Sequence, residues 1–360
     1  MVRMSLPYFH DLSLAEWHTA AGELGLTPMQ AKRFFRAVHG SDATAWSDVP
    51  APERQKALVA AQFALPAWRP FVSRDLATDG TRKFLLGLAD GRTVETVYIP
   101  EGDRGTLCVS SQVGCAMACT FCFTAKMGLH RHLHVHEILA QYTHVRRELG
   151  DLPITNIVFM GMGEPLHNLD HLLAALDVLT DDYGHGFPPR RITVSTSGLL
   201  PAMKVLLSRT TVRLALSVNG PNPEKRRRVM PVEKGYPILD ILAYLRERSD
   251  RVGNHQQVMF EYVMLGGEND GLDDADDLIR MLDGLPGRVN LIPFNAHPGS
   301  PFQRPSDEAV LRFHARLRES GLHVFIRKSR GRDVLAACGQ LHQEHEKRAV
   351  SIRRMDAVSQ

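Results

Sequence analysis

Residues 106–123 read TLCVSSQVGCAMACTFCF, and this stretch decides how the rest of the chain is interpreted. It begins as a short apolar run of the kind that forms a buried strand. It then places Cys115, Cys119 and Cys122 within eight residues, with the spacing Cys-x3-Cys-x2-Cys. The chain has five cysteines, an odd number, so this cluster indicates metal or redox chemistry rather than a disulfide framework.

Three thiolates are one fewer than a closed metal site requires. Four would complete a structural zinc site or an ordinary iron–sulfur site, whereas three leave one iron of a [4Fe–4S] cluster free to bind a small molecule. The spacing, with Phe121 before the last cysteine and Phe123 after it, resembles the signature of radical S-adenosylmethionine (SAM) enzymes. The alternative is a structural zinc loop that borrows a fourth ligand, such as Cys108 or a nearby histidine.

Strand-like and helix-like runs alternate along this part of the chain. The strand-like runs are rich in apolar residues and lie at 106–111, 156–161, 191–198, 213–219, 257–265, 288–294 and 323–329. The helix-like runs between them include 135–150, 169–182, 239–250 and 307–321. Repeated strand–helix units with apolar strands predict an α/β fold around a parallel sheet, either open or curled into a barrel.

The residues before the cysteine loop have a different character. Residues 1 to about 65 have helical periodicity, and one of the predicted helices begins at Pro28 and ends at Gly40. Residues 82–100 are two strand-like runs joined by Asp90-Gly91, which predicts a hairpin. We expect a helical domain over 1–70, a hairpin extension over 71–104, a core over 105–341 and a basic tail over 342–360.

Polar side chains follow several of the predicted strands. Glu164 lies after a glycine turn, in MGMGEP, where its carboxylate can accept a hydrogen bond from the ammonium group of SAM. Further strands end in Ser195, in Ser217 with Asn219, and in Asn295. Barrel and doubly wound folds bind ligands at the carboxyl ends of their strands, so these residues predict a ligand site there.

Two cysteines lie outside the cluster of three. Cys338 follows a run of small residues in a segment rich in arginine and lysine, a setting that favours the thiolate form. Such a cysteine can act as a covalent carrier, and Cys108, before the cluster, can resolve the adduct by disulfide exchange. The alternative is that both are buried apolar thiols.

The net charge of +3 conceals a segregation of charge along the chain. Residues 188–234 hold ten Lys and Arg against two acids, and residues 312–354 hold eleven against four. Residues 268–283 hold seven acids and one arginine. This segregation predicts a basic face for a polyanion. The candidate phosphate contacts are Arg190, Arg191, the run Lys225-Arg226-Arg227-Arg228 and the segment RKSRGR at 327–332.

Other patterns exclude several classes of protein. No apolar run approaches the ~20 residues that span a bilayer. The N-terminus lacks the apolar block of a signal peptide, so we expect a cytoplasmic protein. Alternating histidines at 130, 132, 134 and 136 do not converge on one metal ion, and we expect them at the surface.

Together, these motifs closely resemble those of the RlmN/Cfr radical SAM methyltransferases, which methylate adenine in RNA. The resemblance runs from about Lys83 to Leu341, through TVETVYIPEGDRGTLCVSSQVGCAMACTFC at 93–122, FMGMGEPLHN at 159–168, RITVSTSG at 191–198, EYVML at 261–265, NLIPFN at 290–295 and RKSRGRDVLAACGQL at 327–341. The chain is more similar to the RlmN branch, which modifies adenine C2 in large-subunit ribosomal RNA and in some transfer RNAs. The Cfr branch modifies C8.

The resemblance implies a partial (βα)6 radical SAM barrel with a small N-terminal helical domain and a β-hairpin extension. It implies a cluster bound by Cys115, Cys119 and Cys122, and SAM contacts at Gly163, Glu164, Ser195, Ser217, Val218, Asn219 and Asn295. Many relatives have Ser-Leu-His where this chain has Ser217-Val218-Asn219, so Asn219 departs from the family pattern. Cys338 would carry the methyl group, Cys108 would be its disulfide partner and Glu95 would be the proton acceptor.

Adenine C2 and C8 are electron-poor carbons, so a polar methyl transfer would be very slow and a carbon radical is needed. The implied reaction consumes two SAM molecules per turnover, one to methylate Cys338 and one to activate that methyl group. The implied partners are rRNA, tRNA and an electron donor such as flavodoxin, without a membrane; the oligomeric state is left open. The alternatives are a C8-specific enzyme, a radical SAM enzyme with a non-RNA substrate, or a non-catalytic zinc-stabilised RNA-binding protein.

Overall fold

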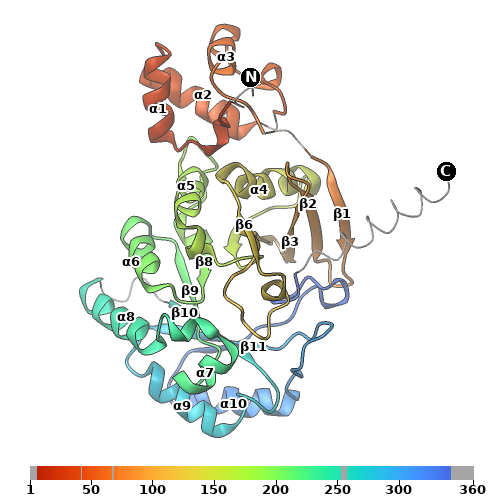
Figure 1. The fold of residues 1–360 in the computed structure, drawn as a ribbon, viewed down its shortest axis with the longest axis vertical. Helices are drawn as coiled ribbons and strands as arrows, with labels where there is room; N and C mark the ends of the chain where they lie inside the picture. The colour runs from red at the N-terminus through yellow and green to blue at the C-terminus, as the bar shows by residue number, and fades with distance from the viewer. Residues whose placement is uncertain (1–5, 42, 67–68, 253–257, 342–360) are drawn as a thin grey trace, which may run out of the picture.

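The computed structural model describes residues 6–41, 43–66, 69–252 and 258–341 (Figure 1). The predicted basic tail over 342–360 lies outside this range. A helical N-terminal lobe comes first, followed by antiparallel strands and then by alternating strands and helices. No helix within these ranges is both long enough and apolar enough to cross a bilayer.

The N-terminal lobe is built from η1 (Phe9–Asp11), α1 (Leu14–Glu23), α2 (Pro28–Gly40), η2 (Trp46–Asp48) and α3 (Glu53–Ala60). The side chains of Ser13 and Thr27 cap α1 and α2 in capping boxes, and Pro28 fills the first position of α2. The predicted limits of this second helix are therefore confirmed. Phe9, Trp17 and Phe34 are fully buried and form an aromatic core under the helices.

One ten-stranded sheet runs through the rest of the molecule, in the order β1-β2-β3-β4-β7-β8-β9-β10-β11-β12. Its first four strands are antiparallel: β1 (Phe71–Leu76), β2 (Arg82–Gly87), β3 (Thr93–Glu101) and β4 (Arg104–Cys108). Gly91 takes a positive φ of 84° in the turn between β2 and β3, so the predicted hairpin is confirmed. The extension is thus continuous with the core sheet.

From β4 onward every pair of neighbouring strands is parallel. The further strands are β7 (Asn156–Phe159), β8 (Ile192–Thr196), β9 (Arg213–Ser217), β10 (Val258–Met264), β11 (Gly287–Pro293) and β12 (Val324–Ile326). The crossover helices are α4 (Val135–Leu149), α5 (Leu169–Thr180), α6 (Leu200–Arg209), α7 (Pro223–Val229), α8 (Ile238–Val252), α9 (Leu272–Leu282) and α10 (Asp307–Glu319). The predicted α/β fold is confirmed, and all carboxyl ends of the parallel strands meet at one edge.

Histidines lie where the N-terminal lobe packs on the core. The rings of His10 and His39 are 4.9 Å apart, and those of His39 and His185 are 5.6 Å apart. His136, on α4, contacts Asp11 of the lobe at 2.8 Å and its side chain is only 12% exposed. The expectation that His136 lies at the surface is therefore wrong, because its partner is supplied by a segment distant in sequence.

The basic and acidic segments partly neutralise each other. Lys225 Nζ lies 2.6 Å from Asp274 on α9, and Arg316 of α10 lies 2.6 Å from Asp276 on the same helix. Arg226 is completely buried. The assignment of Arg226 to phosphate binding is therefore wrong, because this side chain has no exposed surface.

Candidate functional site

The three clustered cysteines lie on a loop that leaves the carboxyl end of β4. The loop passes through β5 (Gln112–Gly114), which pairs with β6 (Leu129–His132), and through η3 (Thr124–Met127). Gly114 has a φ of 78°, and a Cβ there would lie 1.9 Å from the carbonyl oxygen of Gly128. Only glycine fits this approach. The N–H of Cys115 donates to that same carbonyl at 2.9 Å, which fixes the start of the loop.

The three sulfur atoms suit a cationic cluster. Burial raises the pKa of Cys115 to about 12, and burial followed by the proximity of the other thiols raises the pKa of Cys119 well above its usual value. Thiolates here need a positive partner, which cluster iron provides. Across the described ranges, no three His, Cys, Asp or Glu side chains are grouped closely enough for a single metal ion. Cys115, Cys119 and Cys122 line one pocket, and three buried thiols around a common space fit a [4Fe–4S] cluster.

A pocket of about 170 Å³ lies at the carboxyl ends of the strands. It brings together most of the predicted site residues: Cys115, Cys119, Cys122, Gly163, Glu164, Ser195, Ser217, Asn219, Asn295 and Cys338. Three predicted residues do not line it, namely Glu95, Cys108 and Val218. Residues that lie far apart in the sequence therefore meet at one site because the strand ends converge.

The glycine turn after β7 positions Glu164. Gly163 has a φ of 100°, and a Cβ there would lie 2.5 Å from the side chain of Gln112. The Glu164 carboxylate accepts hydrogen bonds from the N–H groups of Ser197 at 2.7 Å and Leu166 at 3.1 Å. Burial raises the pKa of Glu164, so a cationic ammonium group beside it would favour the carboxylate form.

The side-chain oxygen atoms of Asn219 and Asn295 differ in whether they are already hydrogen-bonded within the protein. Asn219 has a φ of 52°, a conformation that asparagine tolerates, and its Oδ1 accepts the N–H of Val263 at 2.8 Å. Its side chain thus holds β10 in place. By contrast, Asn295 Oδ1 is buried beside the pocket and lacks a hydrogen-bond partner in the described part of the chain. Such an atom fits a polar ligand such as SAM.

The sulfur atoms of Cys338 and Cys108 both interact with the guanidinium group of Arg327. Cys338 lines the pocket, whereas Cys108 is buried at the end of β4, and both thiols are free. Burial raises the pKa of Cys108 to about 12, an effect that the Cys338 sulfur reinforces and that Arg327 opposes. Arg327 follows β12 and interacts electrostatically with both sulfur atoms. The expected disulfide is therefore not formed in this structure.

The segment that carries Cys338 is anchored on two sides. On one side, the N–H of Gly331 donates to Asp79 at 3.0 Å and the N–H of Thr78 donates to Asp333 at 2.9 Å. On the other side, Phe123 and Thr124 of the cysteine loop donate to the carbonyl oxygens of Gly339 and Leu341, at 2.8 and 2.7 Å. The turn between β1 and β2 and the cysteine loop thus hold this carrier segment, residues 331–341, between them.

Glu95 lies on β3 and pairs with a buried lysine. Lys83 Nζ lies 3.1 Å from Glu95 Oε1, and the two side chains are 10% and 3% exposed. The carbonyl oxygen of Glu95 accepts a hydrogen bond from Ser110 Oγ at 2.6 Å, just beyond Cys108 at the end of β4. Glu95 therefore lies close to the carboxyl end of β4, and Lys83 balances the charge of its carboxylate.

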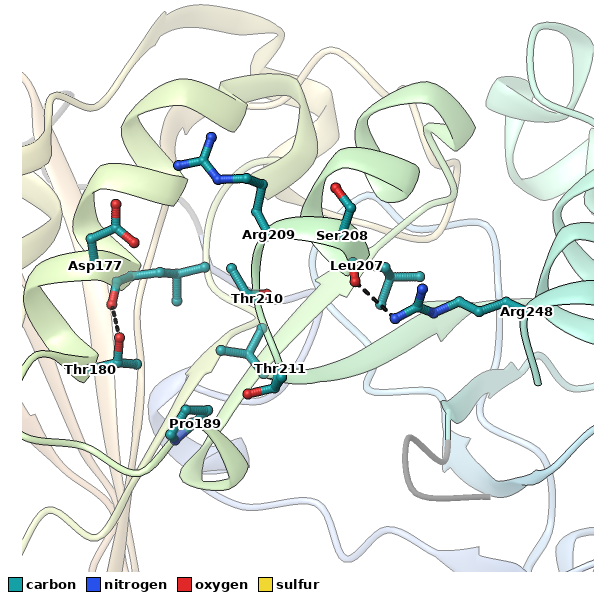
Figure 2. Close-up of a pocket in the computed structure, with 11 residues that line it drawn as sticks. Asp177, Thr180, Pro189, Leu207, Ser208, Arg209, Thr210, Thr211 and Arg248 are labelled. Carbon is teal, nitrogen blue, oxygen red and sulfur yellow. Dashed lines mark hydrogen bonds between the residues drawn. The ribbon is translucent and has the colours of Figure 1, made fainter. Parts of the chain in front are cut away.

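Two other cavities lie toward the opposite ends of the strands. One of about 480 Å³ lies beside the start of β9, where Figure 2 shows Arg248 donating to the carbonyl oxygen of Leu207. It shares no residue with the pocket of the predicted site. The other, of about 670 Å³, shares Met160, Glu261 and Arg327 with that pocket, so these three side chains separate the two spaces.

Sequence reasoning missed several residues of the site. Glu261 lies in EYVML, where the sequence indicates no role for it, and Arg327 begins RKSRGR, which the sequence assigns to phosphate contacts rather than to this pocket. Glu261 is buried and accepts a hydrogen bond from Asn290 at 2.9 Å. A charged residue inside an apolar strand run is the signal that could have found Glu261, since such a residue is rarely buried without a partner.

Comparisons with known proteins agree with this geometry. The model of the radical SAM superfamily matches residues 109–282. A crystal structure of a radical SAM methyltransferase from Sphaerobacter thermophilus superposes with a TM-score of 0.85 at 39% identity, covering 93% of this chain and 99% of that one. Fold and site together define a radical SAM enzyme.

Two curated relatives identify the family within the radical SAM enzymes to which the chain belongs. The dual-specificity RNA methyltransferase RlmN of Phenylobacterium zucineum is 41% identical over 97% of this chain and 94% of its own length. RlmN of Geobacter sulfurreducens is 50% identical over 74% of this chain and 73% of its own. The chain belongs to the RlmN family of radical SAM RNA methyltransferases. Membership implies a [4Fe–4S] cluster and SAM, and an enzyme rather than a non-catalytic zinc protein.

Proposed function

We propose that this enzyme methylates adenine C2 in 23S rRNA and in tRNA, through a methyl group carried on Cys338. The observation that carries the proposal is that Cys338 lines the same pocket as the three clustered cysteines and the polar strand ends. Its proposed partner thiol, Cys108, is the last residue of β4 and interacts electrostatically with the Cys338 sulfur. The relatives named RlmN support C2 rather than C8.

In this proposal, Cys115, Cys119 and Cys122 hold the cluster, while Gly163, Glu164, Ser195, Ser217, Val218, Asn219 and Asn295 surround SAM. Val218 contributes through its buried backbone, and Asn219 contributes by holding β10, since its Oδ1 is already bonded to Val263. When bound, the reduced cluster and SAM supply a carbon-centred radical. Two SAM molecules are consumed per turnover, and an electron donor such as flavodoxin supplies the electrons.

Side chains of the protein hold the methyl carbon, remove the ring proton of adenine and release the product. The Cys338 sulfur holds the methyl carbon as a thioether. After this carbon gives up one hydrogen atom to the carbon-centred radical, it forms the new bond to adenine, so that enzyme and RNA are joined. The Glu95 carboxylate, which pairs with Lys83 at 3.1 Å, removes the proton from the ring carbon. The single electron left on the adduct would return to the oxidised cluster when the cluster is bound. The Cys108 thiol then attacks the Cys338 sulfur and gives up its proton. The sulfur–carbon bond breaks, its electron pair stays on the methylene carbon, that carbon takes up the proton to become the methyl group of the product, and a Cys108–Cys338 disulfide forms.

RNA binding is assigned to the N-terminal lobe and the basic tail. Arg33 and Arg36 are exposed on α2, opposite the buried Phe34 and Phe35. Exposed cations on a small lobe that stands beside the core suit contacts to phosphates (Figure 1). The four segments 1–70, 71–104, 105–341 and 342–360 thus have separate roles in this proposal.

The product of the reaction tests the proposal. The anaerobically reconstituted enzyme, given SAM, a reductant and unmethylated 23S rRNA or tRNA, should yield 2-methyladenosine by mass spectrometry of the digested RNA. Detection of 8-methyladenosine would establish the C8 alternative instead. Formation of neither product, with 5′-deoxyadenosine also absent, would refute the proposed function.

The Cys108→Ala variant should accumulate RNA covalently attached to the protein, since the adduct on Cys338 then has no resolving thiol. The expected amount is stoichiometric with active enzyme, with almost no free methylated RNA. Denaturing gels followed by nuclease digestion measure the adduct. The Cys108→Ala/Cys338→Ala double variant is the control and should show no adduct. Normal turnover of the single variant would contradict the resolving role.

The Glu95→Gln variant should slow methylation by about 100-fold or more, because a general base typically contributes at least that factor. Methylated adenosine formed per minute is the measurement. The Glu101→Gln variant is a matched control on the same strand, since Glu101 is exposed and pairs only with exposed Arg104 among the contacts described. An unchanged rate in Glu95→Gln would return Glu95 to a purely structural role.

A further inference from the structure

Arg226 has no solvent exposure, although it lies in the most basic run of the sequence. Its Nε donates to the carbonyl oxygen of Val218 at 3.1 Å, and its Nη2 donates to those of Ser197 at 2.6 Å and Ser217 at 3.3 Å. One guanidinium group therefore ties the end of β9 to the turn that follows β8. Both segments carry residues assigned above to SAM.

The charge of Arg226 is balanced within the protein. Its Nη1 forms an ion pair with Glu233, whose side chain is 1% exposed. Glu233 in turn accepts the N–H of Ile238 at the start of α8. Because the ion pair satisfies the charge, the remaining guanidinium donors are free to serve the strand-end carbonyls.

The surrounding backbone leaves room for this side chain. A Cβ on Gly220 would lie 2.5 Å from the Arg226 backbone, and a Cβ on Gly198, where φ is 105°, would lie 2.5 Å from Ile241 and 3.7 Å from Arg226 Nη2. Side chains at these two positions would push the strand-end turns away from the guanidinium. The glycines thus permit the close approach that the three hydrogen bonds need.

The same helix also contacts the cysteine loop. The carbonyl oxygen of Val229, the last residue of α7, accepts the N–H of Thr120 at 3.0 Å. Phe121, next along the loop, packs with Val229 and Met230 in a small buried apolar cluster. The C-terminal end of α7 therefore contacts the cysteine loop between Cys119 and Cys122. Arg226, on the same helix, contacts the turns at the ends of β8 and β9.

From this arrangement we propose that Arg226 is a positioning residue, which fixes the SAM-binding ends of β8 and β9 relative to the cysteine loop. The proposal rests on the SAM site given under the proposed function. Lysine cannot replace Arg226, because a single ammonium group cannot reach three carbonyl oxygens in a planar fork. Arg226 touches neither SAM nor substrate in this proposal, and it acts through the backbone.

The test compares SAM affinity with stability in anaerobically reconstituted enzyme without RNA. Arg226→Lys should weaken SAM binding at least about tenfold in equilibrium dialysis, since several charged hydrogen bonds are lost. Its iron content per chain should stay at the wild-type level. The matched control on the same helix is exposed Arg227: Arg227→Gln should change the SAM Kd by less than about twofold.

Two further variants separate positioning from folding. Glu233→Gln keeps the three carbonyl contacts of Arg226 and should lower the Tm while leaving the SAM Kd close to wild type. Ser217→Ala reports on the SAM site itself and should weaken SAM binding. If Ser217→Ala weakens binding and Arg226→Lys does not, the positioning role is overturned and the site stands. If neither variant weakens binding, the proposed SAM site fails and the positioning role fails with it.

Discussion

Replacing Cys338 with alanine should abolish RNA methylation while leaving SAM cleavage to 5′-deoxyadenosine intact. The thiol is the only group in the proposed reaction that carries the methyl carbon, so its loss should cost on the order of 10⁴-fold in rate or more, as removal of a covalent nucleophile does elsewhere. The cluster ligands and the strand-end residues are untouched by the change. Mass spectrometry of digested RNA and of the nucleoside products measures both reactions.

The matched control is Cys338→Ser, which keeps the shape of the side chain and a polar atom beside Arg327. The hydroxyl group is a far weaker nucleophile than a thiolate, so this variant should be as inactive as the alanine variant. Methylation retained by either variant would exclude Cys338 as the carrier. Loss of SAM cleavage together with methylation would show instead that the substitution disturbs the cluster.

Acidification should destabilise the enzyme steeply below pH 6.5. Burial lowers the pKa of His10 to about 4 and of His185 to about 3, and burial lowers the pKa of His39 well below 6.5. The unfolded chain binds protons near pH 6.5 and the folded chain does not, so stability is complete above 6.5 and is lost as the pH falls toward 4. Asp11 opposes the shift of His10, and Arg146 adds to that of His185.

The expected loss is large. Each histidine contributes about 1.4 kcal/mol per pH unit across that interval, so the three together contribute about 4 kcal/mol per pH unit. Domains are typically stable by only about 5–15 kcal/mol, so a protein at the lower end of that range should unfold within about one to two pH units below 6.5. Urea unfolding of the reconstituted enzyme between pH 7.5 and 5 gives the slope.

The control variants are a buried and an exposed histidine. His39→Phe, in a position bordered by Phe9 and Phe35, should reduce the pH slope by about one third. His130→Gln should leave the slope unchanged, because His130 is exposed. Equal slopes in the wild type and His39→Phe would contradict the assignment of the acid sensitivity to this junction.

Local signals were sufficient for much of the fold and of the site. Pro28 and Gly40 mark the limits of α2, and Asp90-Gly91 marks the hairpin turn, because backbone preferences at these residues are strong. Polar residues at strand ends could be grouped without a structure, since parallel strands bring their carboxyl ends to one edge. The prediction that Cys338 belongs to the same site came from the small residues and the arginine-rich and lysine-rich segment before it.

Contacts between distant segments could not be predicted in the same way. The sequence around Arg226 is indistinguishable from an exposed basic run, and only the fold brings three carbonyl oxygens and Glu233 around it. His136 contacts Asp11, which lies far from it in the sequence. Lys83 and Glu95 pair diagonally across β2 and β3, a contact that depends on the register of the hairpin.

The anchoring of the carrier segment has a mechanical consequence. Phe123 and Thr124, directly after the third cluster cysteine, support the backbone on the far side of Cys338. The cysteine loop and residues 331–341 therefore form one linked unit rather than two independent parts. Oxidative damage to the loop should disturb the seating of Cys338 as well, so that loss of iron and loss of methyl loading accompany each other in an air-exposed enzyme.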